Sequence, residues 1–206
     1  MPRGRLITIE GIDGAGKTTL AAALRDALSE RSIDVLALRE PGGVAVAERI
    51  RALVTDGSLS IAPRARPRRG APPRAQLVAE LVAPALEAGR WVLLDRYLDS
   101  SLAYQGAGRG LGIADVRAIN EFGIAGIAAD RTLLLTIDPR AGRARRGDRD
   151  GEPDRLEREA DPFFAAIARG YAELAAAEPG RIRTLDATLP PEAVLAAALA
   201  ELADLL

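Results

Sequence analysis

The sequence contains neither cysteine nor histidine, and aromatic residues make up only 3% of its 206 positions. These absences exclude disulfides, thiolate nucleophiles, imidazole bases, zinc sites and Ser-His-Asp triads. The scarcity of aromatic rings argues against a protein that stacks single-stranded bases. The formal net charge of −1 gives no general attraction to nucleic acids or anionic membranes. Catalysis must therefore use carboxylates, hydroxyls, Arg, Lys, backbone amides and a hard metal ion such as Mg²⁺.

Long apolar runs are absent too. The run that begins at Leu6 stops at Glu10, which is too early for a signal peptide. No stretch approaches the ~18 apolar residues of a membrane span. We therefore expect a soluble, cytoplasmic enzyme or switch without nucleic-acid or membrane partners.

Lysine is nearly absent as well, because Lys17 is the only one and every other basic residue is Arg. A GC-rich genome would replace Lys by Arg wherever either residue serves. A retained Lys therefore indicates a need for a compact ammonium group on a flexible stem.

Short apolar runs alternate with helical patterns along the chain. Strands are predicted at 6–10, 35–39, 91–95, 131–137 and 181–186, and helices at 17–31, 46–54, 74–86, 114–122, 161–177 and 191–205. This alternation predicts an α/β fold, a five-stranded parallel sheet with helices on both faces and ligands at the carboxyl ends of its strands. No linker divides the chain, so we expect one domain over residues 1–206. The charged segment 140–159 is expected to be a mobile flap.

The lone lysine belongs to the motif G-x-x-x-x-G-K-[ST], between a predicted strand and a predicted helix. The residues of this P-loop are Gly11, Ile12, Asp13, Gly14, Ala15, Gly16, Lys17 and Thr18. Glycines let successive N–H groups point at phosphate oxygens, and the helix adds its positive dipole end. Lys17 is expected to reach the β- and γ-phosphates of ATP, and Thr18 to hold Mg²⁺. An ordinary glycine-rich turn is the alternative.

Polar residues follow two further strands. Asp95 ends the strand 91–95, where P-loop enzymes carry a second residue that organises Mg²⁺. Arg39 and Arg96 stand at two strand exits, and both guanidinium groups can converge on a second phosphate. Taken alone, Asp95 can instead be a helix cap or a turn residue, and either arginine can be a solvated surface charge.

Together with the run 99–110, these residues resemble those of bacterial thymidylate kinases, which are P-loop nucleoside-monophosphate kinases. The resemblance extends through 120–122, 138–139, 154–157 and 163–164, and thus covers nearly the whole chain. It implies a three-layer P-loop kinase fold with a short flap, or LID. It also implies transfer of the γ-phosphoryl group of ATP to dTMP, giving dTDP, and a homodimer.

Carried over position by position, the resemblance implies a site for the phosphate and sugar of dTMP. Arg39 and Arg96 would clamp the phosphate, and Asp13 would approach the 3′-hydroxyl. Tyr104 would pack where a ribose 2′-hydroxyl would sit, which would favour the deoxynucleotide.

The resemblance also implies a site for the thymine and surroundings for the metal. Arg74 and Gln105 would hydrogen-bond the edge of the thymine, and Ser101 would line its pocket. Asp95 and Glu10 would lie near the metal and its waters. The loop after Asp186 would border the adenine.

Residues 12–15 carry no positive charge, so this chain resembles family members whose catalytic cation comes from the flap. The flap offers Arg143, Arg145, Arg146, Arg149 and Arg155. We expect Arg149 to meet the transferring group. For any single one of these residues, the alternative is a solvated charge on a helix.

The segment 66–73 departs from the family. It has the family's length, but Gly70 replaces a Phe that would stack on thymine, and three Pro oppose a regular helix. Genuine divergence and a pair of compensating single-nucleotide shifts both explain it, and we favour the second. Residues 62–73 are expected to be irregular and exposed, with a helix starting near Arg74. This departure keeps two alternatives open: another nucleoside-monophosphate kinase, or an ATP-binding relative with an impaired acceptor site.

Overall fold

The computed structural model describes residues 2–45, 48–49, 71–147 and 161–206. Within these residues, five parallel strands form one sheet in the order β2-β3-β1-β4-β5. The strands are β1 (Leu6–Gly11), β2 (Val35–Arg39), β3 (Trp91–Asp95), β4 (Arg131–Thr136) and β5 (Ile182–Asp186). The predicted five-stranded parallel sheet is confirmed, and each strand begins and ends within one residue of its predicted position.

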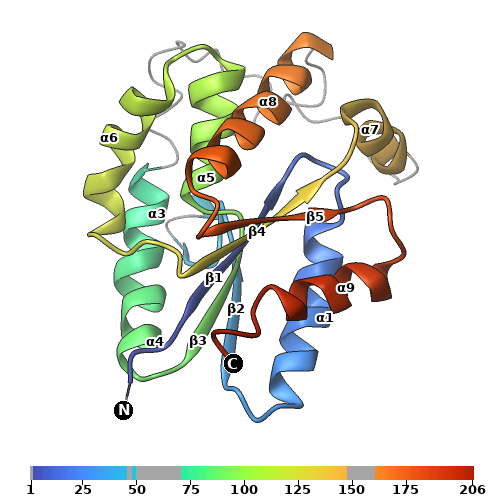
Figure 1. Cartoon of the computed structure of the whole chain (residues 1–206). Helices are drawn as coiled ribbons and strands as arrows, with labels where there is room; N and C mark the ends of the chain where they lie inside the picture. The colour runs from blue at the N-terminus through green and yellow to red at the C-terminus, as the bar shows by residue number, and fades with distance from the viewer. Residues whose placement is uncertain (1, 46–47, 50–70, 148–160) are drawn as a thin grey trace.

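Helices cover both faces of this sheet. They are α1 (Lys17–Ser29), α3 (Ala71–Leu77), the π-helical segment η3 (Val78–Val82), α4 (Ala83–Glu87), α5 (Leu98–Ser101), the π-helical segment η4 (Leu102–Gly108), α6 (Ile113–Ile124), α7 (Pro139–Gly147), α8 (Asp161–Ala177) and α9 (Pro191–Ala200). Figure 1 shows α1 and α9 next to each other on one side of the sheet, with α3, α4 and α6 on the other. Among the described residues, no helix combines the length and apolar character needed to cross a membrane.

The alternation of side chains along β1 assigns the helices to the two faces. Ile7 and Ile9 belong to the apolar cluster that contains the stripe of α1, which is Leu20, Leu24 and Leu28. Leu6, one residue out of phase, belongs to the cluster formed with α3, η3 and α4. Both faces of the sheet are therefore buried, as a parallel sheet requires.

One expectation about a segment boundary is corrected by the structure. Helix α3 starts at Ala71 and not near Arg74, and Pro73 is buried although 62–73 was expected to be irregular and exposed. Pro is compatible with a first helical turn, because the N–H groups there have no intrahelical partner. The start of the predicted flap, through Gly147, is the regular helix α7. Residues 50–70 and 148–160, with the rest of both predictions, lie outside the described residues.

Candidate active site

The predicted site residues gather at the carboxyl ends of the three strands β2, β3 and β1. In the register of the sheet, Asp95 lies beside Ile9 of β1 on one side and beside Arg39 of β2 on the other. Arg96, the residue after β3, is also held at this edge, because its N–H donates to the Ile9 carbonyl at 3.0 Å. The P-loop, Asp95 and the two arginines therefore share one edge of the sheet, as the sequence predicted.

The P-loop depends on glycine at positions where a side chain would collide. Gly11 has φ +138°, and a Cβ there would lie 2.6 Å from the carbonyl oxygen of Leu135. A Cβ on Gly14 would lie 1.9 Å from the carbonyl oxygen of Gly142 in α7, and one on Gly142 would lie 2.9 Å from that of Asp13. Helix α7 thus packs directly on the P-loop backbone.

The Lys17 side chain folds back onto the backbone of the P-loop. Its Nζ donates to the Ile12 carbonyl at 2.8 Å and lies 3.9 Å from Asp13 Oδ1. Only 7% of the residue is exposed, and burial, together with the nearby charge of Arg96, lowers the pKa of Lys17 to about 7. The ammonium is held beside the loop but is poorly neutralised, so an incoming polyphosphate would stabilise its charge.

Thr18 and Asp95 fit a magnesium ion. The Thr18 hydroxyl donates to Asp95 Oδ2 at 2.8 Å, which places two hard oxygen ligands together at the carboxyl edge of the sheet. The described residues contain no cluster of three or more acidic side chains able to hold a metal. The Thr18–Asp95 pair suits Mg²⁺, which is usually bound by one or two protein groups, waters and substrate phosphates.

Arg96 forms the centre of the predicted acceptor site. Its Nη2 donates to Asp13 Oδ1 at 2.5 Å and to the Tyr104 hydroxyl at 3.2 Å. Its Nη1 donates to the Gly11 carbonyl at 3.2 Å and to the Ser100 hydroxyl at 3.0 Å. Arg96 has φ +72°, a strained conformation for a residue with a side chain. The surrounding contacts hold this strain and aim the guanidinium across the P-loop.

Tyr104 completes this cluster. Its hydroxyl donates to Asp13 Oδ2 at 3.1 Å, and its ring lies under the Arg96 guanidinium at 5.0 Å. Burial raises the pKa of the Tyr104 hydroxyl despite the opposing charge of Arg96, so that the group stays a proton donor near neutral pH. Three of the predicted site residues are thereby in mutual contact.

Arg74 is buried within the protein and is not at the surface of the site. It is 3% exposed, and its Nε donates to Glu40 Oε2 at 2.8 Å. Its Nη1 donates to Asn120 Oδ1 at 2.5 Å, and its Nη2 to the Tyr97 carbonyl at 2.9 Å and the Ser101 hydroxyl at 3.2 Å. Arg74 and Ser101, both predicted for the thymine site, are thus in direct contact, but most donors of Arg74 are engaged by the protein.

The remaining predicted residues are less connected. Arg39 is exposed, and its side chain makes no hydrogen bond or ion pair among the described residues. Gln105 lies on η4, and within the described chain its buried Oε1 has no hydrogen-bond partner. A buried amide oxygen without a partner is costly, and a ligand N–H would satisfy it.

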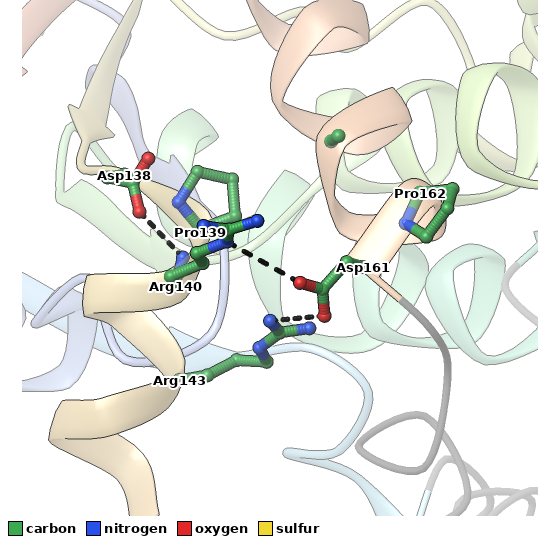
Figure 2. A pocket seen from close by; sticks show the side chains of 7 residues that line it. Asp138, Pro139, Arg140, Arg143, Asp161 and Pro162 are labelled. Carbon is green, nitrogen blue, oxygen red and sulfur yellow. Dashed lines mark hydrogen bonds and ion pairs between the residues drawn. The ribbon is translucent and has the colours of Figure 1, made fainter.

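Three arginines at the start of the predicted flap, Arg140, Arg143 and Arg145, are already engaged by other residues. Arg143 Nη2 lies 2.5 Å from Asp161 Oδ1, and Arg145 Nη1 donates to the Ala187 carbonyl at 2.6 Å. Figure 2 shows Arg140 and Arg143 reaching Asp161 across a pocket of about 230 Å³ between α7 and α8. Arg149, the expected catalytic cation, lies outside the described residues.

Sequence reasoning missed the residues that hold the site from behind. Glu40 and Asn120 fix Arg74, and Glu10 is buried with both oxygens bonded to the protein. An acid directly after Arg39 and a polar residue at an otherwise buried position of α6 were the available signals. Neither signal identifies a partner 30 or more residues away.

Comparison with known proteins decides the family. The thymidylate kinase family model matches residues 9–198. The chain belongs to the thymidylate kinase family. Its relatives include the thymidylate kinase of Halorhodospira halophila, which is 43% identical over 99% of this chain and 96% of its own length. The thymidylate kinase of Deinococcus radiodurans is 45% identical over 93% of each chain.

Solved structures agree with this assignment. The crystal structure of thymidylate kinase from Ehrlichia chaffeensis superposes with a TM-score of 0.79 at 25% identity, covering 98% of this chain and 99% of that one. The expected P-loop kinase fold and the expected family are therefore both confirmed. This member of the thymidylate kinase family is a nucleotide-binding kinase, and its P-loop lies where such an enzyme needs it.

Proposed function

We propose that this chain transfers the γ-phosphoryl group of ATP to dTMP, giving dTDP and ADP. One observation carries the proposal: the P-loop lysine and the Arg96–Asp13–Tyr104 cluster share one edge of the sheet and are joined through Asp13. A donor site and an acceptor site at such close range suit a reaction that depends on alignment and charge neutralisation. Membership of the thymidylate kinase family supports the choice of substrates.

On the donor side, the P-loop would cradle the β- and γ-phosphates of ATP with its N–H groups, and Lys17 would contact their oxygens. Thr18 and Asp95 would hold Mg²⁺. When bound, Mg²⁺ would offset the negative charge of the phosphates during transfer. No side chain of the described site needs to remove a proton, which agrees with the absence of histidine.

On the acceptor side, Arg96 and Arg39 would bind the phosphate of dTMP, and Asp13 would meet the sugar. Tyr104, held by Asp13, would occupy the space of a 2′-hydroxyl. Arg74, Gln105 and Ser101 would surround the base, with the unpartnered Gln105 Oε1 available to a thymine N–H.

A coupled assay of ADP release tests this function. With ATP and Mg²⁺, dTMP should be the best acceptor among dTMP, ribo-TMP, dCMP, dGMP and AMP. Preference for another monophosphate would indicate a different nucleoside-monophosphate kinase. Binding of ATP without turnover on any acceptor would indicate an inactive relative.

We assign the catalytic flap cation to Arg149. Arg149→Ala should lower kcat by roughly 10²-fold with little change in KM for either substrate, because the charge acts mainly on the transition state. Arg145→Ala is the matched control, since Arg145 is engaged by the Ala187 carbonyl. A change confined to KM for ATP in Arg149→Ala would contradict the assignment.

We also propose a cytoplasmic homodimer that pairs through α6. Phe122 is 94% exposed and Ile119 is 39% exposed, one helical turn apart. Phe122→Glu should therefore halve the mass measured by sedimentation equilibrium, while Glu121→Gln serves as a neighbouring control. A monomeric wild-type protein, or a variant that remains dimeric, would contradict this surface.

A further inference from the structure

Glu10 is a fully buried carboxylate whose four contacts come from the turn after β3, from α5 and from α8. Oε1 accepts from the Tyr97 N–H at 2.7 Å and the Ser100 N–H at 3.2 Å. Oε2 accepts from the Ser100 hydroxyl at 2.5 Å and from the Tyr171 hydroxyl of α8 at 2.9 Å. Glu10 thus joins the end of β1 to the turn after β3 and to α8.

This carboxylate is separated from the acceptor-site arginine by a single hydroxyl. Arg96 Nη1 donates to Ser100 Oγ at 3.0 Å, and Ser100 Oγ in turn donates to Glu10 Oε2. The Tyr171 hydroxyl lies 3.1 Å from the same Ser100 oxygen. Burial raises the pKa of the Tyr171 hydroxyl, so this group keeps its proton at neutral pH.

The backbone makes this support necessary. Arg96 has φ +72°, a left-handed conformation that is strained for a residue with a Cβ and persists only where its surroundings maintain it. The N–H of the next residue, Tyr97, is bound by Glu10. The same carboxylate therefore anchors both the strained turn and, through Ser100, the guanidinium that the turn carries.

We propose that Glu10 and Tyr171 are positioning residues for Arg96, acting through the Ser100 hydroxyl. The inference rests on the proposed function, in which Arg96 binds the phosphate of dTMP. With Nη1 fixed by Ser100 and the Gly11 carbonyl, Nη2 faces Asp13 and the acceptor site. Without the Tyr171 hydroxyl, Glu10 Oε2 keeps only the Ser100 hydroxyl as a donor among the described residues. The carboxylate is then held less firmly, and Ser100 and Arg96 lose part of their alignment.

Tyr171→Phe tests the proposal, because it removes one hydroxyl and keeps the ring. The dissociation constant of dTMP, measured by calorimetry without ATP, should rise about three- to tenfold, the effect of one hydrogen bond. Ser100→Ala is the second variant and should act in the same direction. KM for ATP should stay unchanged in both, and circular dichroism should show folded proteins.

Tyr97→Phe is the matched control. It removes a tyrosine hydroxyl beside the same turn, but that hydroxyl donates to the Ile127 carbonyl at 2.9 Å, away from Arg96. Its dTMP affinity should equal that of the wild type.

The decisive comparison uses Arg96→Ala. If Tyr171 acts through Arg96, adding Tyr171→Phe to Arg96→Ala should change dTMP affinity by less than about 1.5-fold. An equal loss with and without Arg96, or an equal loss in Tyr97→Phe, would overturn the proposal. If the wild type is active and Tyr171→Phe binds dTMP equally well, the positioning role is overturned while the proposed function stands. A wild type that neither binds nor phosphorylates dTMP would refute the proposed function itself.

Discussion

Lys17→Met should lose phosphoryl transfer, with kcat reduced by ~10³-fold, and yet be more stable than the wild type. The loss of activity follows from removing the ammonium that would contact the β- and γ-phosphates. Only 7% of Lys17 is exposed, so its aliphatic stem is packed in the protein. Met keeps the length and packing of this stem, whereas Lys17→Ala would remove them together with the charge. Steady-state kinetics with ATP and dTMP measures the first effect, and near-normal turnover would contradict the P-loop assignment.

The gain in stability follows from the pKa of Lys17, which folding lowers from 10.5 to about 7. Between these values the unfolded chain binds more protons, so the free energy of unfolding of the wild type should rise as pH increases from 7 to 10.5. Lys17→Met lacks this titration and should be more stable by about 2–4 kcal/mol at pH 7. The difference should shrink toward pH 10.

Urea unfolding of the nucleotide-free proteins at pH 7 and pH 9 measures this difference. Lys17→Arg is the matched control, because its charge persists at both pH values. A gap between wild type and Lys17→Met that does not change with pH would contradict the account.

Arg74→Ala should lower the free energy of unfolding by about 3–5 kcal/mol, the cost of leaving a buried charge without its partner. The side chain of Glu40 is 8% exposed and lies 2.6 Å from Arg74 Nη2. Asn120 Oδ1 and the Tyr97 carbonyl would lose their donors as well. Discrimination between dTMP and dCMP should also weaken, because the base site loses the group that holds Ser101.

The pH dependence identifies the cause of that loss. Burial raises the pKa of Glu40 above 4.5, and the charge of Arg74 opposes this shift. Removing Arg74 raises the folded-state pKa further, so the variant's stability should fall as pH rises above 4.5, and its deficit should be larger at pH 8 than at pH 5. The double variant Arg74→Met with Glu40→Leu should regain at least about half of the loss. A deficit independent of pH would indicate lost packing alone.

The strands could be predicted because apolar runs such as 91–95 end at unambiguous polar residues. The segment 98–108 was not predicted to be helical, since Gly106 and Gly108 are poor helix formers. Tertiary packing decides the matter there. A Cβ on Gly106 would lie 2.9 Å from Ile113 Cα, and one on Gly108 would lie 2.8 Å from Ile167 Cγ1. The close approach of α6 and α8 therefore requires glycine at these two positions, although glycine has a low helix propensity.

Contacts between residues far apart in the sequence also explain which part of the site was predicted and which part was missed. The P-loop is a local motif, in which one short stretch carries both its backbone geometry and its lysine. The contact of Glu10 with Tyr171 joins residues 161 positions apart, and that of Arg74 with Asn120 spans 46. Such pairs follow from the order in which strands and helices are assembled, which spacing along the chain does not contain.

That strand order also has a consequence for biosynthesis. β1 pairs with β3 and β4, and β2 pairs with β3, so the first two strands made are not neighbours. A nascent chain that has passed β2 must wait for Trp91 before any strand finds its partner. At about 5–20 residues per second, that wait lasts about 3–10 s, during which two apolar strand sequences are unpaired. The ribosome-bound chain is therefore exposed to aggregation until β3 has been made and the sheet can begin to form.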